Sequence, residues 1–136
     1  MKIFQIVVLV LSGLALFYAC SMRLIKPSGA VFLQSYFEDP ANSLESHVDL
    51  ANEIRGVGAV MLLGGLIALL GAFRPDFQQT AFVVTTLIFA GVILGRSISW
   101  IFDGAPPVNL IRAAIAEAVL AVLNAYCMVG TMSESS

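Results

Sequence analysis

Four stretches of the sequence are long, apolar and almost free of charge, and this feature limits the fold more than any other. A helix needs about 20 apolar residues to cross a hydrocarbon layer about 30 Å thick, where every backbone polar group must be hydrogen-bonded within the protein. We therefore expect an all-α, integral membrane four-helix bundle that forms one domain over residues 1–136. The expected spans are residues 3–22, 54–73, 77–102 and 109–132.

Composition supports a membrane protein and excludes several other classes. Hydrophobic residues make up 59% of the 136-residue chain and charged residues only 12%. The net charge of −2 leaves no basic surplus, so we expect no nucleic-acid partner. One His and two Cys are too few for histidine-rich oxygenase sites or for haem held by two histidines. We expect neither a metal site nor a cofactor, and no residue is assigned a catalytic role.

Turn-forming residues separate the spans. Arg74-Pro75-Asp76 predicts a tight turn, and Asp103-Gly104-Ala105-Pro106-Pro107 predicts a helix stop followed by a new helix. The first connection, from Arg23 to about Asn52, is longer. Its apolar residues favour a short amphipathic piece lying along the membrane surface; they are Val31, Phe32, Leu33, Tyr36 and Phe37. Two smaller expectations fall on the same connection: a helix cap at Asn42 or Ser43 and a solvated His47.

The first apolar stretch has a second interpretation. Lys2, an apolar run and then Cys20 resemble a lipoprotein signal peptide. The aromatic residues Phe17 and Tyr18 just before Cys20 are poor for processing, and the run is long for a signal core, so we interpret it as a true span. Successive spans cross the membrane in alternating directions, which puts Cys20 and Cys127 near opposite membrane surfaces. This position excludes a disulfide between them and predicts that both are small buried residues.

The same alternation places most ionisable residues on the side of the membrane opposite to the N-terminus. Helices one and three end on that side, and helices two and four start there. Glu117 lies deepest in the membrane, so it should be paired, protonated or in contact with a wet cavity. On helix three, Arg96, Ser99 and Asp103 recur on one face. The candidate site comprises Glu53, Arg55, Arg96, Ser99, Asp103, Arg112, Glu117 and Asn124.

This cluster has two interpretations. Its three carboxylates and three guanidiniums sum to zero charge, which favours a self-neutralised structural network. The alternative is a ligand or proton site, in which geometry leaves an Arg available to an anion. Asn124, near the membrane middle, favours a hydrogen bond between helices.

Small residues on the same helices predict close packing between helices. They recur at helical spacing, and on helix three the small-residue seam lies three or four residues from Arg96, so packing of this seam brings Arg96 against another helix. The predicted packing glycines are Gly56, Gly64, Gly91 and Gly95.

Basic residues give little information on orientation, because Lys2 and Arg74 on one side balance Arg23 and Lys26 on the other. A short N-terminus with Lys2 favours both termini in the cytoplasm and the charged cluster at the outer leaflet of a bacterial inner membrane. The expected partners are the lipid bilayer and either a second copy of the chain or another membrane protein.

Two segments, Asn52-Glu53-Ile54-Arg55-Gly56 and Gly95 to Pro106, resemble the bacterial four-helix membrane family catalogued as domain-of-unknown-function family 4345. The resemblance covers nearly the whole chain and implies an all-α bundle of four helices, but no activity. Members of that family often end in basic residues, whereas this chain ends Ser133-Glu134-Ser135-Ser136. The residues that match the family's pattern are Glu53, Arg55, Gly56, Gly95, Arg96, Ser99, Asp103 and Gly104.

Three functions are compatible with these patterns. The first is a non-enzymatic accessory or scaffold subunit, or a small homo-oligomer. The second is a lipid or small-anion binding or transport protein that uses Arg96, Arg55 and Glu117, with Glu117 as the titrating group of a proton-coupled version. The third and least supported is an isomerase of a membrane lipid that uses Glu117, Glu53 and Asp103.

Overall fold

The computed structural model describes residues 2–27 and 48–135, and over these residues the chain is all-α. The helices are α1 (Ile3–Ile25), α3 (Val48–Phe73), α4 (Gln78–Asp103) and α5 (Val108–Ser135), with a short 3₁₀ helix, η4 (Pro75–Phe77), before α4. Each of the four long helices is long and apolar enough to cross a membrane, which confirms the expected four-helix membrane fold. The predictions for residues 31–37, Asn42, Ser43 and His47 lie outside the described residues.

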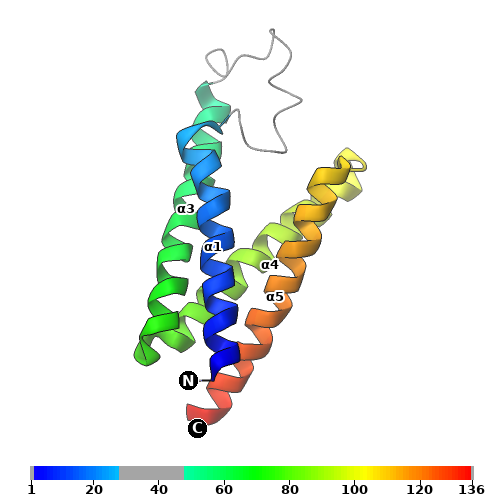
Figure 1. Cartoon of the computed structure of the whole chain (residues 1–136). Coiled ribbons are helices and arrows are strands. Elements are labelled where there is room, and N and C mark those ends of the chain that lie inside the picture. Colours follow the sequence, from blue (N-terminus) through cyan, green and yellow to red (C-terminus); the bar gives the residue numbers. More distant parts are fainter. Residues whose placement is uncertain (1, 28–47, 136) are drawn as a thin grey trace.

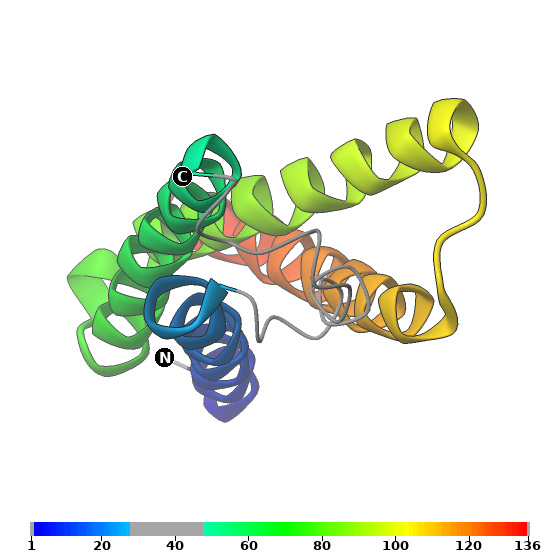
Figure 2. The same cartoon turned by 90° about the horizontal axis from the view of Figure 1, so that it is seen from above.

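The helices form two pairs that diverge toward one end (Figure 1). We call the end where α1 begins and α5 finishes the near end, and the opposite end the far end. α1 packs along α3, α3 packs on α4, and α4 packs on α5, whereas fewer contacts join α5 to α1. Seen from above, α4 and α5 also separate from each other toward residues 104–107 (Figure 2).

Glycine allows α1 and α3 to approach closely. A Cβ added to Gly13 would lie 2.8 Å from Leu69 Cδ2, and one added to Gly65 would lie 3.2 Å from Phe17 Cδ2. Each of these added Cβ atoms would also lie 3.3 Å from the carbonyl oxygen of the other glycine. Dispersion between closely packed backbones therefore holds this pair together, since lipid surroundings provide little hydrophobic drive for helix association.

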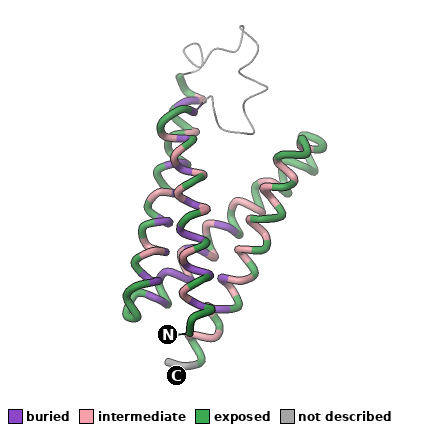
Figure 3. Tube along the Cα trace, in the orientation of Figure 1, coloured by how far each residue is buried: buried purple, intermediate pink, exposed green. Residues whose placement is uncertain are grey.

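The apolar core consists of two clusters, one above the other. Val8, Leu9 and Phe82 belong to the near cluster, together with Cys127, and Leu16, Cys20, Met61 and Phe89 form the far cluster. Cys20 and Cys127 are therefore buried in different halves of the bundle. Burial follows α1 along most of its length, whereas the far halves of α4 and α5 are mostly exposed or intermediate (Figure 3). α1 contributes to both core clusters, and the interpretation of residues 3–22 as a true span stays a prediction.

Polar side chains cross this apolar core in layers. In the near layer, Gln78 Nε2 donates a hydrogen bond to Gln5 Oε1 at 3.3 Å. In the middle layer, Asn124 Nδ2 donates to Ser12 Oγ at 2.7 Å, and Thr85 Oγ1 donates to Asn124 Oδ1 at 2.7 Å. All three middle-layer residues are 0% exposed. Asn124 thus connects α1, α4 and α5, as its expected hydrogen bond between helices required.

The predicted packing glycines differ in what surrounds them. Gly64 does pack between helices, because a Cβ there would meet the side chains of Ile88 and Leu16. For Gly56, Gly91 and Gly95, an added Cβ meets no atom of the described residues within 4 Å, so within these residues they do not pack against another helix of the chain. The reason is their position: Gly56 lies on the exposed side of α3, and α4 leaves its neighbours toward the far end. Contact of these glycines with a second chain stays a prediction.

Substitution of glycine should test this packing. Gly71 lies against Ala81, and a Cβ added to Gly71 would meet the Ala81 Cβ as well as Phe77 O at 3.2 Å. We expect Gly71→Ala to lower the free energy of unfolding by about 1–3 kcal/mol, because neither obstacle can rotate away. Thermal melting in mild detergent measures the effect. Gly91→Ala is the matched control, and we expect it to be neutral or slightly stabilising. Equal melting temperatures for the two variants would contradict the packing described here.

Candidate functional site

An ion pair joins α4 and α5 in the far half of the bundle. Arg96 Nε donates to Glu117 Oε2 at 2.7 Å, and Arg96 Nη2 donates to Glu117 Oε1 at 2.9 Å. The two side chains are only 18% and 17% exposed. A guanidinium and a carboxylate that meet through two parallel hydrogen bonds form one of the strongest polar contacts available to side chains. Glu117, the deepest carboxylate predicted from the sequence, is therefore paired.

Arg23 of α1 belongs to the same group of charges. It is 8% exposed, its Nη1 donates to the Ala19 carbonyl oxygen at 2.8 Å, and its charge interacts with those of Arg96 and Glu117. We call Arg23, Arg96 and Glu117 the far layer. It draws one residue from each of α1, α4 and α5, the same three helices that build the middle layer.

Sequence reasoning missed Arg23 because the first span was expected to end at residue 22, whereas α1 continues to Ile25. A signal was present: Leu9, Leu16 and Arg23 are seven residues apart, and this spacing keeps them on one helix face. Leu9 and Leu16 belong to the core, so Arg23 follows them into the protein. Gln5 and Ser12 of α1, and Gln78 and Thr85 of α4, show the same seven-residue spacing.

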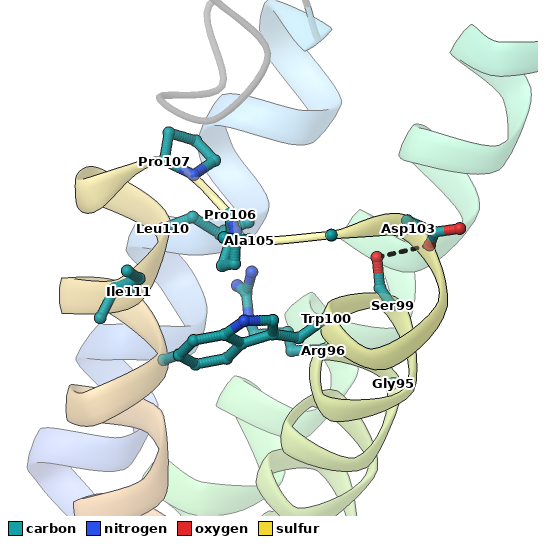
Figure 4. A pocket seen from close by; sticks show the side chains of 12 residues that line it. Gly95, Arg96, Ser99, Trp100, Asp103, Ala105, Pro106, Pro107, Leu110 and Ile111 are labelled. Atoms are coloured by element: carbon teal, nitrogen blue, oxygen red, sulfur yellow. Dashed lines mark hydrogen bonds between the residues drawn. The ribbon is translucent and has the colours of Figure 1, made fainter.

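A pocket of about 440 Å³ lies between the far ends of α4 and α5, and we call it the far pocket (Figure 4). Gly104, with a φ of 103° that favours glycine, ends α4, and the chain then crosses to α5 through Pro106 and Pro107. Trp100 extends from α4 toward Ile111 on α5. At the rim, Ser99 Oγ donates to Asp103 Oδ2 at 2.8 Å. Arg96, Gly95, Leu110 and Ala114 complete much of the lining.

Three of the predicted site residues, Glu53, Arg55 and Arg112, belong neither to this ion pair nor to the lining of the far pocket. Glu53, Arg55 and Arg112 are exposed, and within the described part of the chain no ion pair joins them or Asp103 to a partner. Within residues 2–27 and 48–135, the ion pair that the structure shows among the six charges of the expected network is Arg96 with Glu117, and the wider network stays a prediction. The order of the spans assigns a residue to a side of the membrane but not to a face of its helix. At the start of α3, Glu53 and Arg55 lie on the exposed face.

The far pocket combines one deep guanidinium with mostly apolar walls. Of the described residues that line it, Arg96 and Asp103 are charged, and Trp100, Leu110 and Ile111 provide large apolar surfaces. Such a pocket suits a molecule with a small anionic group and an apolar body. Within residues 2–27 and 48–135 there is no group of three His, Cys, Asp or Glu side chains that could hold a metal ion.

Comparison with known proteins gives a family for the chain. The model of the family described as "Domain of unknown function (DUF4345)" matches residues 3–128. The chain belongs to this family. The match confirms the resemblance seen in residues 52–56 and 95–106, and the DUF4345 region contains the middle and far layers and the whole far pocket. No curated relative and no solved structure matches the chain.

Removal of one partner from the ion pair should lower the free energy of unfolding more than removal of both partners. We expect Arg96→Ala to lower the free energy of unfolding by about 3–5 kcal/mol, because Glu117 would remain buried without its guanidinium. The double variant Arg96→Ala with Glu117→Ala should recover a large part of this loss. A double-mutant cycle of unfolding in detergent measures the coupling. Strictly additive effects of the two substitutions would rule out an energetically important pair.

Proposed function

We propose that this multi-pass membrane protein binds an anionic amphiphile, such as an acidic lipid, in the far pocket and has no catalytic role. The observation that carries the proposal is the position of Arg96. Its guanidinium lines the pocket while Glu117 fixes it through two hydrogen bonds of 2.7 and 2.9 Å. A pre-oriented guanidinium loses little freedom when it binds an oxyanion, which favours binding.

The polar contacts of the far layer orient Arg96 toward an anionic ligand. A guanidinium has five N–H donors in a planar fork, and the pair with Glu117 uses its Nε and Nη2 edge. Arg23 adds a second positive charge to this end of the bundle, and Asp103 at the pocket rim adds a second negative one. These four charges sum to zero, so the support for an anionic ligand is the orientation of Arg96 and not a surplus of charge.

The walls of the pocket favour an amphiphile over a free anion. Trp100, Ile111 and Leu110 present apolar surface beside Arg96, and both helices belong to membrane-spanning segments. A free phosphate shares the chemistry of a lipid phosphate at Arg96 but gains nothing from these walls. Arg55 has no part in the proposal, since it lies on the exposed surface of α3 and does not line the pocket.

Trp100 supplies a direct test, because it is the single Trp of the chain and lines the pocket. We expect dioctanoyl phosphatidylglycerol to change its fluorescence saturably in a neutral detergent. Dioctanoylglycerol, which lacks the anion, and inorganic phosphate, which lacks the apolar body, should each bind at least about tenfold more weakly. The variant Arg96→Gln with Glu117→Gln keeps two amides that can pair, and should weaken phosphatidylglycerol binding about 10- to 100-fold.

Arg55→Gln is the matched control for loss of a positive charge, and its titration should equal that of the wild type. Equal affinity for phosphatidylglycerol and dioctanoylglycerol would refute the role of Arg96. Tighter binding of inorganic phosphate than of the lipid would identify a free-anion site instead.

A second function is favoured by a different observation. The Arg96–Glu117 pair and the middle layer each satisfy their own polar groups within the chain, as in a structural clasp of an accessory or scaffold subunit. In native mass spectrometry of the protein extracted gently from its membrane, this function predicts a stoichiometric protein partner that the paired Gln variant retains. The lipid-binding function predicts a small bound mass that the same variant loses.

Orientation forms part of the proposal. We propose a bacterial inner membrane, with the near end in the cytoplasm and the far pocket in the outer leaflet. The start of α1 and the end of α5 lie at the same end of the bundle, which supports placing both termini on one side (Figure 1). Green fluorescent protein fused after residue 136 should therefore fluoresce in the cytoplasm. Green fluorescent protein that is exported unfolded does not become fluorescent. A dark fusion at normal expression would reverse the orientation.

A further inference from the structure

A second hollow lies at the near end, on the opposite side of the core from the far pocket. It measures about 670 Å³ and lies between the first residues of α1 and the last turns of α5. Lys2, Phe4 and Gln5 line it from α1, and residues of α5 from Val122 to Gly130 line it from the other side. We call this hollow the near groove.

The near groove follows one face of α5. Val122, Tyr126 and Val129 are spaced by four and three residues, so they lie in one row along the helix. From Val122 to Gly130 this row is about 12 Å long at 1.5 Å per residue. One leaflet contributes about 15 Å of hydrocarbon, half of the usual core thickness. The groove therefore covers most of the length that an acyl chain spans within a single leaflet.

Polarity separates the two ends of the groove. Its walls are predominantly apolar, and the Gln5 amide oxygen already accepts hydrogen bonds from Gln78 Nε2 at 3.3 Å and from the Lys2 backbone N–H at 3.1 Å. Lys2 is the one charged residue among the described residues that line the groove, and it precedes the first residue of the α1 span. The positive charge of Lys2 at the membrane boundary thus lies beside the apolar part of the near groove.

We propose that the near groove binds one acyl chain of an acidic phospholipid of the near leaflet, with its phosphate held by Lys2. The ammonium has three N–H donors, so it can contact a phosphate oxygen in addition to a group of its own chain. The apolar walls recognise the acyl chain, and the charge of Lys2 selects an anionic headgroup over a zwitterionic one. This site shares no lining residue with the far pocket, so it does not depend on the function proposed above.

Filling the groove is the most direct test. Gly130 lines it, and a Cβ added there meets no atom within 4 Å, so Gly130→Leu places a side chain in the groove without a clash at Cβ. Gly91→Leu is the matched control, because Gly91 also has no atom within 4 Å of an added Cβ and lines neither hollow. Lys2→Gln removes the charge and leaves the apolar walls intact.

The probe is an equimolar mixture of phosphatidylglycerol and phosphatidylcholine with identical acyl chains, and native mass spectrometry counts the retained lipids. The wild type and Gly91→Leu should retain phosphatidylglycerol, Gly130→Leu should retain one molecule fewer, and Lys2→Gln should lower its preference over phosphatidylcholine at least about fivefold. Thermal melting of each variant confirms that it is folded, and Ala125→Leu gives a second way to fill the groove. The far pocket is unchanged in all four variants, so its occupancy cannot imitate these differences.

Three outcomes would overturn the proposal. Equal lipid counts for Gly130→Leu, Ala125→Leu and Gly91→Leu would show that the groove holds no lipid. An unchanged preference for phosphatidylglycerol in Lys2→Gln would remove the headgroup contact. A dimer that is present in the wild type and lost in Gly130→Leu would show that a second copy of the chain occupies the groove.

Discussion

Polar contacts between α1, α4 and α5 are the constraint on which the rest of the structure depends. Apolar helices gain little free energy from association in lipid, because lipid chains are as apolar as the helix surfaces. Hydrogen bonds and close packing must therefore determine which helices meet and in which register. The middle layer joins these three helices through Asn124. In the far layer, the Arg96–Glu117 pair joins α4 to α5, while the buried Arg23 donates a hydrogen bond within α1. α3 contributes to neither layer and associates with α1 through closely approaching glycines instead.

The sequence was sufficient to predict the fold because the bilayer imposes simple rules on it. Apolar stretches near 20 residues and Pro- or Gly-containing turns predict four spans, and the helices of the structure differ from these spans mainly at their ends. α3 starts six residues before its expected span, since a helix need not stop where its apolar stretch does. This same property hid Arg23, which lies in the last turn of α1 beyond the predicted end.

The candidate site was predictable only in part, because side of the membrane and helix face are separate questions. The order of the spans put Arg96 and Glu117 on the same side of the membrane, and the structure pairs them. It gave Glu53, Arg55 and Arg112 the same side, but these side chains face outward. Neither the pocket beside Arg96 nor the near groove follows from periodicity, since both depend on how α4 and α5 separate and on where α5 passes the start of α1.

The middle layer lies where the two helix pairs are still in contact, and beyond it α4 and α5 diverge. From Asn124 to Val108, α5 extends about 24 Å. A rotation of α5 by about 5° about Asn124 would therefore displace the far end of this helix by about 2 Å. The Arg96–Glu117 pair and the connection at residues 104–107 join α4 and α5 on this side of the middle layer, so a rotation of the two helices would carry the far pocket with it.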